Sequence, residues 1–165
     1  MKNIKQTILF LSILFCSLSQ VNAQLTGYGS GSFSPSNYIH NTGTLYTDNI
    51  RAKGTNYTLI SGTTADVDLN NFHGTINNGD KLLIIQMKGS FIGNHQAVTV
   101  TSISGSTYSL QTVSSEPMLS YSASGSDRFQ VIKINEYYDF TLNGGLVTCN
   151  NWNDADGSGG VLALM

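Results

Sequence analysis

The chain has 165 residues, with eight Lys and Arg, ten Asp and Glu, and a formal net charge of −2. Charged residues make up 11% of it, against about a quarter in an ordinary globular domain, so Ser, Thr, Asn and Gly must supply much of its solubility. Its basic residues are scattered, whereas nucleic-acid binding needs concentrated positive charge. The composition therefore argues against a role in binding nucleic acid.

The N-terminal segment, residues 1–23, has the three-part pattern of a secretory signal peptide. Lys2 and Lys5 give a positive start, residues 8–18 form an apolar core, and Ala23 ends a small-residue cleavage site. The core is about half the length that a membrane-spanning helix needs, which is about 20 residues. We therefore expect a signal helix cleaved after Ala23, a secreted or cell-surface protein, and no membrane span after cleavage.

The segment that follows, residues 24–43, is rich in Gly and Ser and predicts a loose leader. Beyond the signal, no window repeats apolar residues at the spacing of a helix. The exported part has one cysteine, Cys149, and so cannot form an internal disulfide. A small buried side chain is the interpretation we favour for Cys149, and its role otherwise stays open.

Residues 44–148 predict an all-β module. A turn cluster at 77–80 precedes the apolar run of 81–88, which predicts a strand buried on both faces. Further strands are predicted at 97–103, 107–113 and 129–134. The Gly-containing turn at 104–106 joins the first two of these as a hairpin. Residues 139–148, with Asn-Gly-Gly in their middle, predict another hairpin.

The short strands recur about every ten residues, which is typical of a small antiparallel β-sandwich or barrel. The last segment, residues 149–165, ends in the apolar run 161–165. We interpret this segment as the start of a truncated β region, such as the beginning of a β-solenoid. An exposed apolar run of this kind predicts poor solubility for the isolated piece.

Candidate catalytic and metal-binding residues are few. His40, His73 and His95 lack the spacing of metal ligands and have no neighbouring Cys. The chain contains no Gly-x-Ser-x-Gly elbow, and its Gly-rich leader does not complete a dinucleotide-binding loop. We therefore predict that the protein is not an enzyme, and we assign it no catalytic residue, no cofactor-binding residue and no metal ligand.

Two pairs of aspartates remain open. Asp154 and Asp156 precede Gly157 as in a calcium-binding loop, but the first and twelfth positions of an EF-hand would hold Trp and Ala. An irregular calcium site and a polar turn are both open here. Asp66 and Asp68 alternate and so share one face of a strand, where protection of a sheet edge is an equally good explanation.

The eight tyrosines could serve as a platform for a glycan or a protein, because Tyr combines apolar area with a polar group. Packing in the core or on a strand is the commoner use. Tyr137 and Tyr138 are adjacent, which on a strand sends their rings to opposite faces.

Four segments carry a family resemblance: residues 79–89 (GDKLLIIQMKG), residues 98–100 (VTV), residues 129–134 (FQVIKI), and Trp152-Asn153 followed by 159–164 (GGVLAL). Over about residues 75–165 the chain resembles the N-terminal region of large secreted surface proteins of Bacteroidetes-type bacteria, which commonly end in a sorting or gliding-type domain. In those proteins the last of these segments opens a repetitive β-solenoid region. The resemblance implies an adhesin-like architecture and no catalytic residues.

These observations lead to one main functional hypothesis. We expect a non-catalytic N-terminal structural or binding module of a secreted or cell-surface adhesin-like protein, which caps a downstream β-solenoid. Its expected partners are the downstream β-rich region of the same polypeptide and an extracellular protein or glycan. The alternative is an accessory domain of a secreted carbohydrate-active protein. A small free-standing enzyme is the weakest hypothesis.

Overall fold

The computed structural model describes residues 36–164, so the predicted signal peptide and most of the predicted leader lie outside the described residues. The described chain is all-β. Its strands are β1 (Ser36–His40), β2 (Thr44–Tyr46), β3 (Arg51–Leu59), β4 (Thr64–His73), β5 (Lys81–Lys88), β6 (His95–Ser104), β7 (Thr107–Thr112), β8 (Arg128–Lys133), β9 (Tyr137–Leu142) and β10 (Leu146–Thr148). Within residues 36–164, no helix has the length and apolar character needed to cross a membrane.

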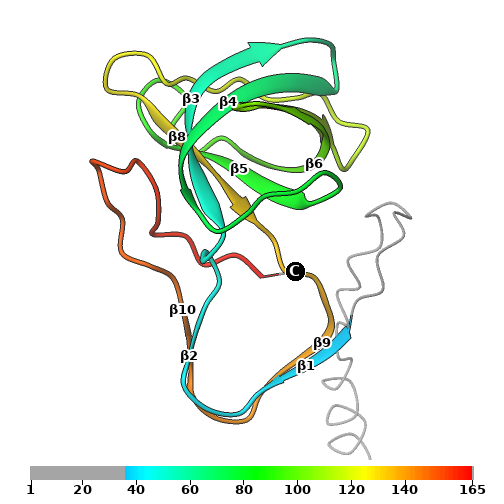
Figure 1. The fold of residues 1–165 in the computed structure, drawn as a ribbon, viewed down its shortest axis with the longest axis vertical. Coiled ribbons are helices and arrows are strands. Elements are labelled where there is room, and N and C mark those ends of the chain that lie inside the picture. Colours follow the sequence, from blue (N-terminus) through cyan, green and yellow to red (C-terminus); the bar gives the residue numbers. More distant parts are fainter. Residues whose placement is uncertain (1–35, 165) are drawn as a thin grey trace, which may run out of the picture.

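Six strands close into a barrel in the order β3-β4-β7-β6-β5-β8 (Figure 1). All neighbouring pairs are antiparallel. The connection is a Greek key, because β5, β6 and β7 follow one another as neighbours and β8 returns beside β5. The sequence was compatible with either a sandwich or a barrel. The structure is a closed barrel, whose strands have no free edge.

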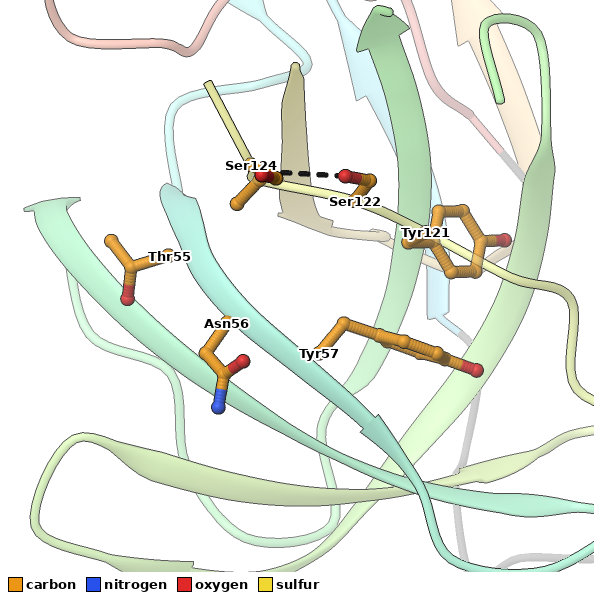
Figure 2. A pocket seen from close by; sticks show the side chains of 7 residues that line it. Thr55, Asn56, Tyr57, Tyr121, Ser122 and Ser124 are labelled. Carbon is orange, nitrogen blue, oxygen red and sulfur yellow. Dashed lines mark hydrogen bonds between the residues drawn. The ribbon is translucent and has the colours of Figure 1, made fainter. Parts of the chain in front are cut away.

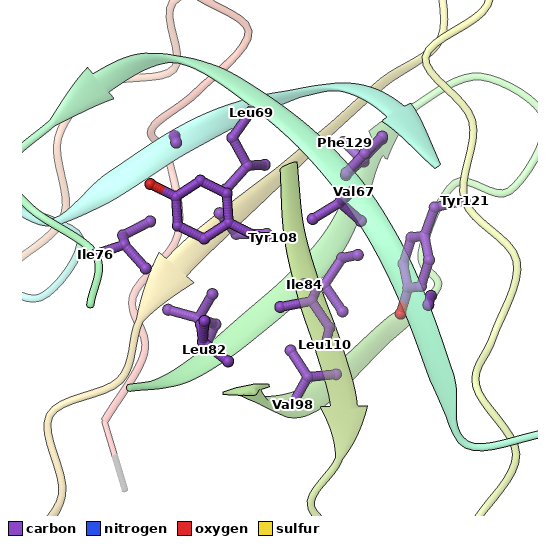
Figure 3. Close-up of a cluster of buried hydrophobic side chains, with 14 of the residues drawn as sticks. Val67, Leu69, Ile76, Leu82, Ile84, Val98, Tyr108, Leu110, Tyr121 and Phe129 are labelled. Atoms are coloured by element: carbon purple, nitrogen blue, oxygen red, sulfur yellow. The ribbon is translucent and has the colours of Figure 1, made fainter. Parts of the chain in front are cut away.

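The barrel interior is filled by side chains from alternate strand positions (Figure 3). In β5, Leu82 and Ile84 are fully buried, whereas Leu83 and Ile85 on the other face are half-buried. The prediction that this strand is buried on both faces is therefore wrong. In a barrel wall, successive residues of a strand point alternately into the core and to the outside. An uninterrupted run of apolar residues can therefore form a strand of which only one face is fully buried.

The hairpin predicted across 104–106 is confirmed, since β6 and β7 pair antiparallel around Gly105, whose φ is 62°. The hairpin predicted at 139–148 is wrong. Instead, β9 pairs in parallel with β1, and β10 pairs in parallel with β2. Backbone N–H groups of the later segment donate to carbonyl groups of the earlier one: Asn143 N donates to His40 O at 2.9 Å, and Leu146 N donates to Gly43 O at 2.8 Å. We call these four strands the parallel ribbon.

Candidate functional site

The two halves of the parallel ribbon follow the same path at a constant separation in sequence. Every residue of the ribbon from Tyr38 onward pairs with the residue 102 positions later, from Tyr38 with Phe140 to Tyr46 with Thr148. Between the strands lie two corners, Asn41-Thr42-Gly43 and Asn143-Gly144-Gly145. Their final glycines have nearly the same left-handed φ, 83° and 81°, so the two corners bend the backbone alike.

Side chains repeat this register at the corner and just beyond the end of the ribbon. At the corner, Asn143 Nδ2 donates to Asn41 Oδ1 at 3.2 Å. Beyond β10, Asn150 Nδ2 and Asn150 N donate to Asp48 Oδ1 at 2.7 and 2.8 Å. Both pairs are again 102 residues apart in the sequence. Hydrogen bonds between side chains at equivalent positions add to the stability of parallel, in-register strands, as asparagine ladders do in stacked sheets.

An aromatic cluster fills one face of the ribbon. The Tyr38 ring centroid lies 5.0 Å from that of Tyr137 and 5.8 Å from that of Phe140. Burial, followed by the charge of Tyr38, raises the pKa of Tyr137. Tyr138 points away and is 74% exposed. The prediction that Tyr137 and Tyr138 lie on opposite faces is thus confirmed.

The ribbon exposes several large apolar side chains. Among the described residues each of its two sheets contains two strands only. Ile39, Leu142 and Leu146 are 58%, 52% and 56% exposed. Parallel sheets normally occur with both faces covered, and two-stranded ribbons are marginal in water. The ribbon is therefore a candidate interaction surface.

The three histidines lie in separate places. His40 is buried in the ribbon, where its Nε2 is 3.3 Å from Gly43 O. His73 ends β4, with its Nε2 3.9 Å from Asp156 Oδ2. His95 begins β6 and its Nδ1 is 2.9 Å from the carbonyl oxygen of its own turn. The structure does not bring them together.

The Asp154–Asp156 segment forms a compact polar turn. Asn153 Oδ1 accepts hydrogen bonds from the backbone N–H groups of Ala155 and Asp156, at 3.0 and 3.3 Å. The two carboxylates have different partners, because Asp156 Oδ2 accepts from Asn153 Nδ2 at 2.7 Å and Asp154 Oδ1 lies 3.4 Å from Lys88 Nζ. Across residues 36–164, no three His, Cys, Asp or Glu side chains are grouped as metal ligands.

Asp66 and Asp68 lie on the outer face of β4, which pairs with β3 and β7. The interpretation that they protect a sheet edge is wrong, because a strand inside a closed barrel has no edge. Asp68 instead ties three strands together: its Oδ1 accepts from Thr107 Oγ1 at 2.6 Å and its Oδ2 from Asn56 Nδ2 at 3.3 Å. Cys149, just after β10, is a half-buried free thiol.

The barrel carries a second candidate site, a cleft of about 280 Å³ between β3 and the segment 121–124 (Figure 2). It is lined by Thr55, Asn56, Tyr57, Tyr121, Ser122, Ala123 and Ser124. Tyr57 Oη donates to Leu119 O at 2.6 Å, and its ring meets that of Tyr121 edge-on at 5.4 Å. Hydroxyl, amide and aromatic groups of this kind suit binding of a polar ligand. None of the lining residues is an acid or a histidine that could serve as a catalytic proton donor.

Two buried glutamines hold the loops around these sites. Gln86 Nε2 donates to Ser122 O at 2.8 Å, and Gln86 Oε1 accepts from Ser122 N at 2.9 Å, which fixes one wall of the cleft. Gln130 makes the same two-way contact with Gly159, at 2.9 and 2.8 Å. Sequence reasoning missed both roles. The available signal was a glutamine inside each of two otherwise apolar strands.

The tyrosines of the cleft predict a loss of stability in alkali. Burial raises the pKa of Tyr57 from 10.0 to about 12. A raised folded-state pKa stabilises the fold below pH 10, and this contribution is lost as the pH rises from 10 to about 12. Urea unfolding at pH 8 and at pH 11.5 should show this loss, and Tyr57→Phe should lose less of its own unfolding free energy over the same interval. Equal losses in the two proteins would show that Tyr57 is not responsible.

Comparison with known proteins finds no matching family model, no matching curated protein and no matching solved structure. The functional conclusion therefore rests on the chain's own geometry.

Proposed function

We propose that the chain is a non-catalytic structural module at the N-terminal end of an exported, adhesin-like surface protein, where it caps a β-solenoid. The parallel ribbon carries this proposal. Two segments that pair in parallel at one constant offset, with matching corners, have the geometry of two successive coils of a solenoid. Such an array needs its first coil covered, because an open sheet edge invites association with other chains.

The position of the barrel supports the same role. The chain enters and leaves the barrel at one point, where Arg51 on β3 pairs with Ile132 on β8 and Lys133 N donates to Ile50 O at 2.8 Å. The barrel therefore occupies the connection between the first coil and the second (Figure 1). The barrel itself offers no site for strand addition, because its strands form a closed sheet without a free edge.

A fusion experiment tests the capping role. The chain is joined to the front of a soluble parallel β-solenoid whose own N-terminal cap has been deleted, and association is followed by light scattering. We expect the fusion to stay monomeric at concentrations where the uncapped solenoid associates. Deletion of Gly144, which shifts β10 against β2, is the matched control and should restore association. Equal association of the capped and uncapped solenoids would contradict the proposal.

The cleft favours a second candidate function, an accessory glycan-binding domain of a secreted carbohydrate-active protein. Tyr57 offers a partly exposed ring, and Asn56 and Ser124 offer polar groups beside it. Titration with neutral oligosaccharides, followed by NMR shifts of residues 55–57 and 121–124, tests this candidate. Saturable shifts that Tyr57→Ala abolishes would favour it over the capping role, whereas their absence would exclude it for the sugars tried.

A further inference from the structure

The outer edge of β9 and β10 is the unpaired side of the second coil. In a parallel pair, successive residues direct their backbone groups alternately to the two sides of the strand. Asn143 N points to the first coil, where it donates to His40 O. The N–H groups of Leu142 and Phe140 therefore face the opposite side, where the described chain places no third strand.

The side chains of this edge are arranged to continue the stack. In the Asn143–Asn41 contact the later coil donates Nδ2 and the earlier coil accepts with Oδ1, and the same direction holds for Asn150 and Asp48. Within residues 36–164, the Oδ1 atoms of Asn143 and Asn150 accept no hydrogen bond. Each can accept from one more amide in a coil placed beyond them.

After β10 the chain leaves the ribbon and then turns back, so that a following segment could run beside β9. Residues 151–163 rise beside the barrel and turn back (Figure 1), and Gln130 holds this segment at Gly159. Its far end lies beside the residue that follows β2, where Ala163 N donates to Thr47 Oγ1 at 3.1 Å. The segment after β10 therefore turns back towards the point where the chain enters the barrel.

We propose that the outer edge of β9 and β10 is a strand-addition site for a third parallel coil of the same polypeptide. That coil carries an asparagine level with Asn143 and a glycine level with Gly145. Asparagine is expected there because its side-chain amide can donate to Asn143 Oδ1 and also accept from the next coil, which repeats the contact that Asn143 makes with Asn41. Glycine is required because a Cβ on Gly145 itself would collide with Gly43 O of the coil before it, and its φ is 81°. The inference rests on the proposed capping role and specifies the partner of that surface.

The test supplies the coil in cis, where a linked segment has a high effective concentration. A second copy of residues 137–164 is added after Met165 of the exported chain, and amide hydrogen exchange is measured. We expect the N–H groups of Phe140 and Leu142 to exchange about tenfold more slowly than in the parent chain. One control replaces the added copy's corner asparagine by alanine, and another inserts one residue before that corner.

The outcomes separate this inference from the capping role. The inference is supported if the intact copy slows the exchange of these two amides, the shifted copy does not, and the alanine copy slows it less. Unchanged exchange overturns it, and equal protection by all three copies overturns the asparagine requirement. Either result leaves the light-scattering test of capping unaffected. Should the extended chain be insoluble, a synthetic peptide of residues 137–150 with Cys149→Ser should shift the Phe140 and Leu142 resonances saturably, and a scrambled peptide should not. Equal or absent shifts overturn the inference.

Discussion

The variant Gly54→Ala should lose about 3 kcal/mol of unfolding free energy or more. Gly54 lies in β3, and a Cβ built on it overlaps the ring of Phe129. That ring is fully buried and has aromatic neighbours at Tyr57 and Tyr121, with centroids 6.5 and 6.0 Å away. It has no free volume to move into, because a packed core is as dense as an organic crystal. Urea denaturation of residues 24–165 measures the loss.

Two further variants make the Gly54 result specific. Gly62→Ala adds the same methyl group where a Cβ meets nothing within 4 Å, so it should leave the unfolding free energy unchanged or slightly raised. Phe129→Leu removes the ring that the added Cβ would overlap. This variant should be destabilising alone, but combined with Gly54→Ala it should restore part of the unfolding free energy that Gly54→Ala loses. Additive losses in the double variant would contradict the packing explanation.

The variant Gln130→Leu should cost about 2 to 4 kcal/mol of unfolding free energy. The Gln130 side chain is fully buried on β8, where its amide satisfies both the N–H and the C=O of Gly159. Leucine keeps the approximate volume but leaves two buried backbone groups without a partner. The amide of Gly159 should also exchange faster than in the parent chain.

The matched control for this variant is Gln111→Leu on β7, where the side chain is exposed. It should change the unfolding free energy by less than about 0.5 kcal/mol. A Gln130→Leu protein as stable as the Gln111→Leu protein, with unchanged exchange at Gly159, would show that the glutamine does not hold the segment after β10.

Most of the barrel could be predicted from local sequence patterns. The turn at 77–80, the hairpin around Gly105 and the strand at 129–134 depend on residues close together in the chain, so alternation and turn chemistry are sufficient to find them. The local patterns do not distinguish a closed barrel from a sandwich, because the same short strands suit both folds. The pairing of β3 with β8 that closes the barrel joins residues far apart in sequence.

The ribbon could not be predicted in the same way. Asn143-Gly144-Gly145 is a strong local signal for a tight turn, which suits a hairpin as well as the corner of the parallel ribbon. The deciding information is long-range: Asn41 and Gly43 stand 102 positions before Asn143 and Gly145. A single Asn-x-Gly repeat across so long a separation is too weak to detect without the structure. The cleft likewise combines β3 with a loop about 65 residues later, as Tyr57 and Tyr121 show.

The most direct test of the account is the strand direction and register of the ribbon in solution. Nuclear Overhauser contacts should be measured in isotopically labelled protein that spans residues 24–165. The account predicts contacts between Tyr38 and Phe140 and between Leu45 and Val147, together with slow exchange of the Asn143 and Leu146 amides. Contacts that instead pair residues 139–142 with 146–148 in an antiparallel hairpin would contradict it, and the capping role would then lose its structural basis.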